Sequence, residues 1–260
     1  MKFKLMKFFK YQATGNDFII IDNYGKEIKL TSDQVKKICD RRFGVGADGL
    51  ILLEEKEGYD YSMIYYNSDG NISTFCGNGS RCLAHFAHKK KLFKHKAHFF
   101  ANNSNYLAFI QKGLISIKMP NISNFKINDD GTIFIDSGSP HVVLFRKNVN
   151  KIDVINLGRE IRYSEMYSQN GVNINFVEEI NKSLNVRTYE RGVENETLSC
   201  GTGAVAAVIA SHINGLIESG NVVNVKTKGG DIKVSYNYDL NLYKDIYLSS
   251  DVSLVFYGEL

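Results

Sequence analysis

The feature that most constrains this chain is an internal repeat built around two cysteines. Cys76-Gly77-Asn78-Gly79 and Cys200-Gly201-Thr202-Gly203 lie 124 residues apart, close to half of the 260 residues. Three more pairs recur at an offset of 123 or 124: Asn67 with Glu190, Asn16 with Ser139, and Gly49 with Asn173. Four coincidences at one offset predict two halves with the same fold.

Strand-like runs alternate with short helical stretches along the whole chain. Helices are expected over 32–41, from Cys76 to about Lys90 and from Cys200 to about Asn214. Strands are expected over 18–21, 50–53, 61–66, 97–100, 106–110, 114–118, 132–136, 141–145, 173–177, 184–189, 222–227, 231–236, 246–249 and 253–257. The region 120–131 is the best candidate for a boundary between the halves.

Composition narrows the class of protein. Hydrophobic residues make up 43% and charged residues 23%, as in ordinary globular proteins, and the net charge is only +4. That balance does not indicate a nucleic-acid partner. No apolar run reaches the length of a membrane span, and the basic, aromatic N-terminus lacks the pattern of a signal peptide. We therefore expect a cytoplasmic protein without nucleic-acid or membrane partners.

The four cysteines stand at positions 39, 76, 82 and 200. Cytosolic thiols stay reduced, and these spacings match no common zinc pattern, so neither a disulfide framework nor a metal site is expected. Cys39 and Cys82 are predicted to be inert core thiols. Cys76 and Cys200 differ, because each stands in a glycine-rich sequence just before a predicted helix.

A cysteine at a helix start has two chemical advantages. The unpaired N–H groups and partial positive charge of the helix N-terminus bind carboxylates and lower the pKa of a thiol. Two similar halves tend to pack about a pseudo-twofold axis, which would bring Cys76 and Cys200 together across a cleft. One thiolate could then remove a Cα proton while the other thiol returns a proton to the opposite face. The alternative, a phosphate cradle, lacks the Gly-Lys-Ser/Thr ending of a P-loop.

Several motifs in order resemble the diaminopimelate epimerase family over nearly the whole chain. Phe75 to Cys82 is similar to the family's CGNGxRC signature, and Thr14 to Phe18 matches its GNDF. Tyr189-Glu190-Arg191-Gly192, followed by Glu196 to Ala204, resembles the second cysteine motif. The segment from Arg41 to Gly49 also matches.

The resemblance implies an isomerase that interconverts LL- and meso-2,6-diaminopimelate, in lysine and peptidoglycan-precursor synthesis, without pyridoxal phosphate, any other cofactor or a metal. It implies an α+β fold of two pseudo-symmetric halves, each a curved, barrel-like sheet around a central helix, with the active site in the cleft between them. The N-terminal half would comprise 1–119 with a returning strand in 253–260, and the C-terminal half 120–252. Family members are commonly homodimers, so a homodimer is expected.

The resemblance also assigns roles to individual residues. Cys76 and Cys200 correspond to the catalytic pair. Asn67, Asn173 and Arg191 would hold the distal amino-carboxylate end of the substrate. The remaining assignments are Glu190 at the reacting amino group, Asn16 as a polar group of the cleft, backbone N–H donors at Gly77, Asn78, Gly201 and Thr202, His141 beside the first cysteine as a possible proton acceptor, and Ser139 as a supporting residue.

Two departures and several alternatives accompany these assignments. The family often has Asn at the position of Ser139, and some members have Gln at that of Gly49. His141 could be structural, Arg191 a surface ion pair and Asn67 a turn residue. The histidines between 85 and 98 are interpreted as part of a solvated basic surface. Functional alternatives are a racemase of another amino acid on the same scaffold and a protein that binds amino acids without turnover.

Overall fold

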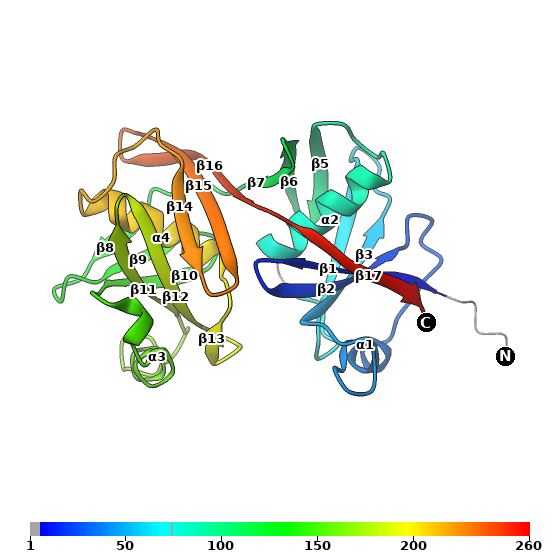
Figure 1. Ribbon diagram of the computed structural model, residues 1–260, viewed down its shortest axis with the longest axis horizontal. Coiled ribbons are helices and arrows are strands. Elements are labelled where there is room, and N and C mark those ends of the chain that lie inside the picture. The colour runs from blue at the N-terminus through cyan, green and yellow to red at the C-terminus, as the bar shows by residue number, and fades with distance from the viewer. Residues whose placement is uncertain (1–5, 74) are drawn as a thin grey trace. The chain divides into compact units, whose positions relative to one another are not determined.

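The computed structural model describes residues 6–73 and 75–260. The described chain divides into two units. Unit 1 comprises the residues up to Ile117 together with Ser250–Leu260, and unit 2 comprises Lys118–Ser249. In Figure 1 the elements of unit 1 run from blue to green and end in red, and those of unit 2 run from green to orange.

Unit 1 is a mixed sheet with two helices. Its strands are β1 (Lys7–Ala13), β2 (Asn16–Asp22), β3 (Gly49–Glu54), β4 (Tyr61–Asn67), β5 (Lys96–Ala101), β6 (Ser104–Gln111), β7 (Leu114–Lys118) and β17 (Ser253–Glu259). They lie in the order β17–β1–β2–β3–β4–β5–β6–β7, and the β2–β3 and β4–β5 pairs are parallel. The C-terminal strand β17 thus completes the sheet of the N-terminal unit.

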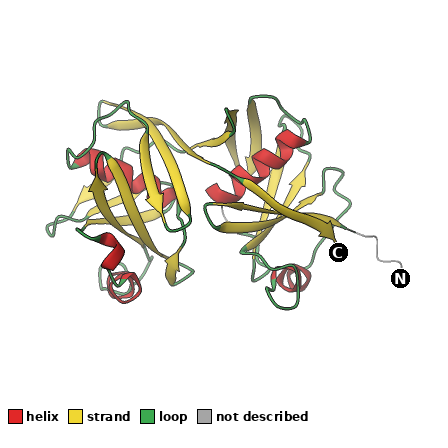
Figure 2. Cartoon of the chain, in the orientation of Figure 1, coloured by secondary structure: helices red, strands yellow, loops and turns green. Residues whose placement is uncertain are grey.

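Two helices cover the sheet of unit 1. Helix α2 (Gly77–Lys89) packs against β1, β2, β3 and β4, and the sheet curves around it (Figure 2). The buried face of α2 includes Cys82, Leu83 and Phe86. Helix α1 (Ser32–Cys39) buries Val35 and Cys39 in a separate cluster with β2 and β3 residues. Burial of these apolar faces holds the layers together.

Unit 2 has the same arrangement. Its strands are β8 (Phe125–Ile127), β9 (Ile133–Asp136), β10 (Pro140–Phe145), β11 (Asn173–Ile180), β12 (Ser183–Glu190), β13 (Asn195–Thr197), β14 (Val223–Thr227), β15 (Gly230–Asp239) and β16 (Leu242–Ser250). They lie in the order β8–β9–β10–β11–β12–β14–β15–β16, with β10–β11 and β12–β14 parallel and β13 paired to the end of β12.

Helix α4 (Gly201–Ile213) is the central helix of unit 2. Every residue from Gly203 to Ser211 is buried, which is typical of a helix apolar on all sides. A 3-10 turn, η1 (Val149–Lys151), and helix α3 (Val154–Arg162) precede β11. Val149 and Val154 join a second cluster with residues of β10, β11 and β12. The α+β class and the two repeated domains expected from the sequence are confirmed.

The strand registers place the repeat residue by residue. In unit 1 Phe18 of β2 pairs with Gly49 of β3, and Gly49 pairs with Asn67 of β4. In unit 2 His141 of β10 pairs with Asn173 of β11. The first strand pair therefore makes Phe18 equivalent to His141, and Gly49 equivalent to Asn173. The offsets of 123 and 124 residues found in the sequence therefore also relate equivalent strand positions in the two sheets.

All predicted helices and strands are present, but β1, β8, β13 and α3 were not expected. Strand β1 lacks a clean alternation because Lys10 is buried in it beside Asp17. Helix α3 contains Gly158, a residue that is unfavourable in the interior of a helix. Thr31 is the N-cap of α1 and forms a capping box with Gln34.

Candidate active site

Cys76 is the N-cap of α2. Its sulfur accepts a hydrogen bond from the Gly79 N–H at 3.4 Å, and its thiol can donate to Asn16 Oδ1 at 3.9 Å. The preceding Phe75 stacks on Tyr106 of β6 at 4.2 Å between ring centroids. An N–H donor at a helix start stabilises negative charge on sulfur. The first cysteine is therefore placed where a thiolate is favoured.

Asn16 is held in one orientation by an acidic neighbour. Its Nδ2 donates to Asp48 Oδ2 at 2.6 Å, which leaves Oδ1 directed to Cys76 and to Asn78 Nδ2 at 3.1 Å. Arg41 in turn binds both Asp17, in a bidentate pair at 2.6 and 3.0 Å, and Asp48 at 2.9 Å. This network holds the Asn16 amide beside the thiol.

Asn78, in the first turn of α2, is buried and lies between two polar partners. Its Nδ2 donates to Asn16, and its Oδ1 accepts from Arg81 Nη2 at 2.5 Å. Arg81 is fully buried. The polar chain from Arg81 through Asn78 and Asn16 thus ends at the Cys76 sulfur.

Cys200 is the N-cap of α4, with backbone angles close to those of Cys76. Its sulfur lies 3.5 Å from Thr202 Oγ1. Thr202 Oγ1 lies 2.9 Å from His141 Nε2, and the Thr202 carbonyl accepts from the Ser137 hydroxyl at 2.8 Å. A side-chain hydroxyl therefore contacts the Cys200 sulfur, whereas amide groups contact the Cys76 sulfur.

His141 is fully buried and uses both of its ring nitrogens. Asn175 Nδ2 lies 2.9 Å from Nδ1, while Asn175 Oδ1 accepts from Thr188 Oγ1 at 2.9 Å. Since Nδ1 accepts from this amide, Nε2 carries the proton and donates to Thr202, which frees the Thr202 hydroxyl proton for the Cys200 sulfur. Burial lowers the pKa of His141 to about 3, so the imidazole is neutral at physiological pH.

Asn173 is hydrogen-bonded to two other expected site residues of unit 2, Ser139 and Arg191. Its Nδ2 donates to Ser139 Oγ at 2.8 Å and to the Pro140 carbonyl at 2.9 Å, and its Oδ1 accepts from the Arg191 backbone N–H at 2.9 Å. Arg191 is exposed, and one of its guanidinium donors binds the Asn170 carbonyl at 2.9 Å. Asn173 therefore positions both Ser139 and the backbone of Arg191.

The remaining expected residues lie at equivalent strand ends. Asn67 ends β4, and its backbone N–H and carbonyl close a turn with Asn71 and Gly70. Glu190 ends β12 and accepts from Thr197 Oγ1 at 2.9 Å. Beside Asn67, a Cβ added at Gly49 would lie 2.5 Å from the Tyr65 ring, so the larger residue found in some family members would have no room here.

The other two cysteines are buried in the core. Cys39 is 3% exposed, and burial raises its pKa to about 11. Cys82 is fully buried, and burial raises its pKa well above its usual value. A buried thiol with a raised pKa is a poor nucleophile and a poor base at neutral pH. The prediction that both are core thiols is confirmed.

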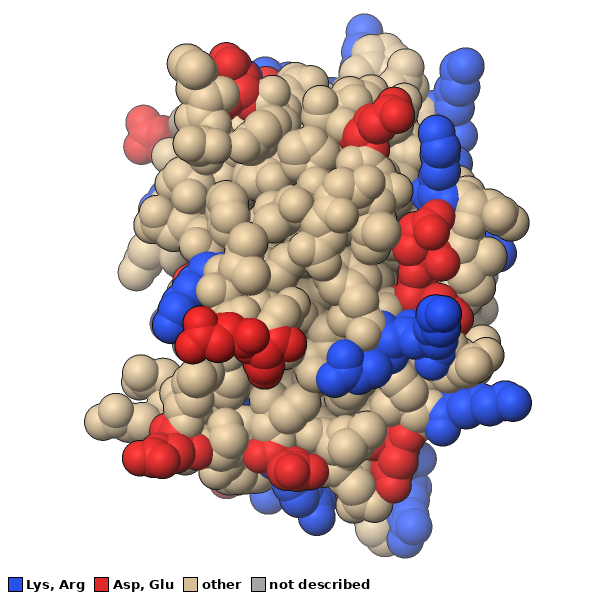
Figure 3. Space-filling view, turned by 90° about the vertical axis from the view of Figure 1, so that its left-hand side faces the viewer, with Lys and Arg blue, Asp and Glu red and all other residues tan. Residues whose placement is uncertain are grey.

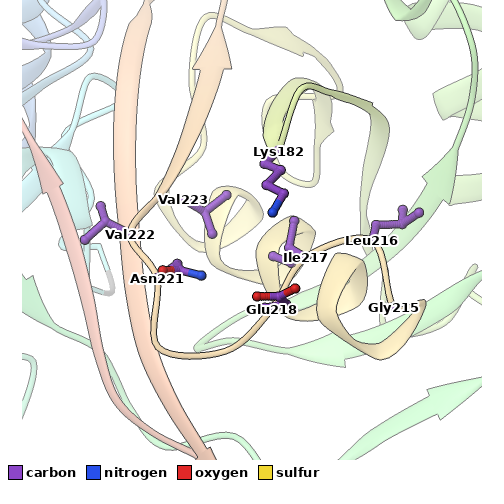
Figure 4. A pocket seen from close by; sticks show the side chains of 8 residues that line it. All are labelled: Lys182, Gly215, Leu216, Ile217, Glu218, Asn221, Val222 and Val223. Atoms are coloured by element: carbon purple, nitrogen blue, oxygen red, sulfur yellow. The ribbon is translucent and has the colours of Figure 1, made fainter.

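Two surface cavities of unit 2 lie away from Cys200. One, of ≈ 370 Å³, is formed by the segment after α4 and by Lys182, whose side chain extends toward Ile217 and Glu218 in Figure 4. The other, of ≈ 600 Å³, lies between α3 and the sheet, with Asp130, Glu160 and Glu165 among its lining residues. Neither cavity is lined by any of the expected site residues, so neither bears on their chemistry.

Charge and metal-binding groups add nothing further to the site. Over residues 6–73 and 75–260, no cluster of three or more His, Cys, Asp or Glu side chains has the arrangement of a metal site. In that part of the chain no helix combines the length and apolar character that a membrane crossing needs. On the face of unit 2 in Figure 3, acidic and basic side chains are interspersed around a largely uncharged centre.

Comparison with known proteins decides the family. The model of the family described as diaminopimelate epimerase matches residues 8–121 and again 133–246, so each unit matches it. This chain belongs to the diaminopimelate epimerase family. The family consists of isomerases, and the match to both halves agrees with the repeat seen in the strand registers.

Relatives with this name cover nearly the whole chain. The diaminopimelate epimerase of Flavobacterium psychrophilum is 47% identical, over 96% of this chain and 98% of its own length. Those of Chlorobaculum tepidum and Aquifex aeolicus are 40% and 36% identical, over 95% and 98% of this chain and 98% of their own lengths.

Solved structures share the fold at low sequence identity. A PhzF-family phenazine biosynthesis protein of Bacillus anthracis superposes with a TM-score of 0.78 at 16% identity, over 99% of both chains. A hydroxyproline epimerase of Agrobacterium vitis superposes with a TM-score of 0.67 at 14% identity, over 100% of this chain and 94% of its own. These likenesses show that this chain has the same fold as those proteins.

The structure thus groups the expected residues into two half-sites. The half-site of unit 1 joins Cys76, Asn16 and Asn78, and a second set in unit 2 joins Cys200, Thr202 and His141. The sequence had not singled out Arg81, Asp48 or Asn175. The repeat aligns Asn175 and Thr188 with Ile51 and Tyr65 of unit 1. A polar residue at a position that is apolar or aromatic in the other half is a signal by which the sequence could have shown both.

Proposed function

We propose that this protein epimerises LL-2,6-diaminopimelate to the meso isomer by a cofactor-independent two-base mechanism with Cys76 and Cys200. The supporting observation is that the two cysteines are N-caps of equivalent helices in a member of the diaminopimelate epimerase family. The reaction belongs to diaminopimelate and lysine biosynthesis, as the names of the relatives imply.

In the proposed reaction, one cysteine as thiolate removes the proton from the substrate Cα. The electron pair left behind is delocalised into the adjacent carboxylate, and the other cysteine, as thiol, donates its proton to the opposite face of Cα. The substrate neither gains nor loses atoms, and the two cysteines exchange protonation states. The reverse reaction uses the same groups in the opposite order.

The helix N-termini supply the electrostatic part of the proposal. The carboxylate gains charge in the intermediate, and N–H groups at Gly77, Asn78, Gly201 and Thr202 are the proposed donors. Preorganised donors lower the barrier more than flexible ones, because they need no rearrangement during the reaction. The hydrogen bonds that hold Asn78 and Thr202 supply that rigidity.

The distal end of the substrate is assigned to the strand ends. Arg191 and Asn173 of unit 2, with Asn67 of unit 1, are the proposed partners of the second carboxylate and ammonium groups, and Glu190 that of the reacting ammonium. The hydrogen bond from the Arg191 backbone to Asn173 supports the first two, because it holds the backbone of Arg191 beside the Asn173 amide. Ser139 and His141 are proposed as positioning residues, since their described hydrogen bonds are to Asn173 and Thr202.

A deuterium experiment tests this function. Purified protein in D2O with LL-diaminopimelate should form the meso isomer and incorporate deuterium at Cα, as followed by NMR. Cys76→Ala and Cys200→Ala should each abolish epimerisation, with Cys39→Ala as a matched control that stays active. Reduced, folded protein that forms no meso isomer would contradict the substrate assignment.

A racemase of another amino acid is the alternative on this scaffold. It is supported by the shared fold with proteins named hydroxyproline epimerase and proline racemase. The same assay with proline, hydroxyproline and histidine at equal concentration separates the two. Faster deuterium exchange with one of these than with diaminopimelate would favour the alternative.

Two further predictions follow from the resemblance to the family, a homodimer and a cytoplasmic location. Light scattering on the purified protein tests the first, because a mass near twice 29.4 kDa is expected. Fractionation of the source cells tests the second.

A further inference from the structure

Arg81 stands out among the buried residues as a charged side chain with few partners. It lies in α2, is fully buried and is the largest side chain with no exposed surface in the described chain. Only its Nη2 has a described hydrogen bond, to Asn78 Oδ1 at 2.5 Å, while Nε and Nη1 have none. Among the described residues, no carboxylate forms an ion pair with it.

The fold itself does not require this arginine. Burying a charge without an ion-pair partner opposes folding, and an apolar residue of similar size is often equal or better for stability. The equivalent position in unit 2 is Val205, which is fully buried in α4. The same helix in the same sheet therefore accepts an apolar side chain, and Arg81 needs an explanation beyond packing.

We propose that Arg81 is a positioning residue for Cys76: its buried charge favours the Cys76 thiolate, and its hydrogen bond to Asn78 fixes the amide pair beside that sulfur. This inference rests on the proposed function, because it assigns to unit 1 the half-site whose cysteine is the thiolate in the resting enzyme.

The groups around Arg81 support a positive charge on Arg81 and a negative charge on Cys76. Burial lowers the pKa of Arg81 to about 10, so it stays cationic at neutral pH, and the nearby thiols of Cys82 and Cys76 act in the opposite direction. Burial keeps Cys82 protonated, because it raises the pKa of that thiol. Cys76, at the partly exposed helix start, is thus the neighbour that can carry a negative charge.

The other charged groups near this helix start are already paired with each other. Asp17 of β2 binds Lys10 of β1 at 2.8 Å and Arg41 at 2.6 Å, which holds the pKa of the Asp17 carboxyl well below its usual range. Asp48 binds Arg41 and the Asn16 amide. The two positive and two negative charges of this cluster sum to zero, whereas Arg81 has no ion-pair partner among the described residues.

Apolar side chains of the sheet lie beneath the first turn of α2. A Cβ added at Gly79 would meet the ends of Ile51, Met63 and Phe18 at 3.0 to 3.3 Å. This apolar floor lowers the local polarity, and a low-dielectric surrounding strengthens the effect of one nearby cation.

The rate of alkylation of Cys76 by iodoacetamide tests the proposal without any substrate. In full-length protein carrying Cys200→Ala, the rate at the Cys76 peptide is measured by mass spectrometry from pH 5 to pH 10. We expect Arg81→Met to move the midpoint of the profile upward and to slow alkylation at pH 7 about tenfold, the change in thiolate fraction for one unit of pKa. Arg81→Lys, which keeps a positive charge, should stay near the parent profile.

The matched control is the other cysteine. In Cys76→Ala protein, Arg81→Met should leave the Cys200 profile unchanged, because the effect is local to α2. Arg81→Gln keeps a donor for Asn78 and provides the neutral comparison if Arg81→Met does not fold. An unshifted Cys76 profile in a folded neutral variant, or an equal shift at both cysteines, would overturn the proposal. These outcomes do not depend on diaminopimelate turnover, so failure of the proposed function is detected separately.

Discussion

The two cysteine half-sites share a backbone and differ in where their buried polar groups come from. In unit 1 the polar group is Arg81, on the helix, and the equivalent sheet positions are apolar or aromatic. Unit 2 has the opposite arrangement, with Val205 on the helix and His141, Asn175 and Thr188 on the sheet. Each unit thus places one polar system beneath its cysteine.

The difference teaches that a repeated fold does not imply repeated chemistry. A buried guanidinium is a fixed positive charge. The imidazole of His141 is neutral, and its described link to Cys200 is the hydrogen bond to Thr202. The first favours a thiolate, and the second orders a hydroxyl that can serve either a thiol or a thiolate. The proposed two-base reaction needs one base and one acid at a time, and under that proposal the unequal half-sites would set which cysteine starts as thiolate and which as thiol.

The largest expected effect comes from removing either thiol while keeping its shape. Cys76→Ser and Cys200→Ser should each lower kcat by about 10²–10⁴-fold, the usual contribution of a general acid or base, with little change in KM. Steady-state epimerisation rates in both directions check this. A Ser variant that keeps more than half of the parent kcat would remove that cysteine from the mechanism.

The pH dependence of stability tests whether the buried His141 of unit 2 is neutral, in contrast to the charged Arg81 of unit 1. Because burial holds the pKa of His141 at about 3, below the ordinary 6.5, the unfolded chain binds more protons between these values. Stability should therefore fall as the pH falls below about 6.5, by about 2–3 kcal/mol at pH 4.5. Urea unfolding at pH 7 and pH 4.5 measures this.

His141→Gln is the control for that measurement, since it retains hydrogen bonding without titration. The acid loss of the wild-type chain should exceed that of the variant by the amount above. Equal losses in both proteins would mean that His141 is not held neutral by burial.

Gly79 and Gly203 stand at equivalent positions, so their substitution compares the side chains beneath the first turns of α2 and α4. A Cβ at Gly203 would lie 2.5 Å from Asn175 Oδ1, an atom already held by Thr188, whereas one at Gly79 would lie 3.0 Å from the flexible end of Ile51. Gly203→Ala should therefore cost about 1–3 kcal/mol of unfolding free energy, and Gly79→Ala less. Chemical denaturation of both variants tests the order, and a larger cost at Gly79 would reverse our description of these side chains.

The smallest expected difference is between Asn16, the first residue of β2, and Ser139, the residue before β10. Asn16 lies beside the Cys76 sulfur, and Ser139 is bound to Asn173. Asn16→Ala should lower kcat about 10–100-fold, as for a hydrogen bond near a charged group, and Ser139→Ala about 2–10-fold. The ratio of the two rates is the test, and equal losses would indicate that the half-sites are used alike.

The sequence predicted the repeat, the central helices and the position of Cys76 and Cys200 at the start of those helices, because these depend on periodicity and on residue type alone. It did not predict β1, where Lys10 breaks the alternation by pairing with Asp17 from the neighbouring strand. It also missed α3, whose Gly158 is required by the Tyr189 side chain, since a Cβ there would lie 2.4 Å from it. Both reasons involve contacts between segments distant in sequence.

The same limit applies to the candidate site. Arg81 is part of the cysteine motif, but only the structure shows that its guanidinium is fully buried and bound to Asn78. His141 was expected beside Cys76 as a possible proton acceptor. That role stays a prediction, and the structure adds that both ring nitrogens are hydrogen-bonded, to Thr202 and Asn175. Burial and hydrogen-bond partners, not residue types, decide these roles.

The most direct test of the two-base account is the position of deuterium early in the reaction. Protein in D2O is given unlabelled LL-diaminopimelate, and the Cα label is measured by NMR and mass spectrometry in product and in remaining substrate during the first few per cent of turnover. Two separate bases predict deuterium in nearly every product molecule and almost none in the remaining substrate. Product that retains its original proton, or equal labelling of substrate and product, would contradict the assignment of Cys76 and Cys200 to opposite faces of Cα.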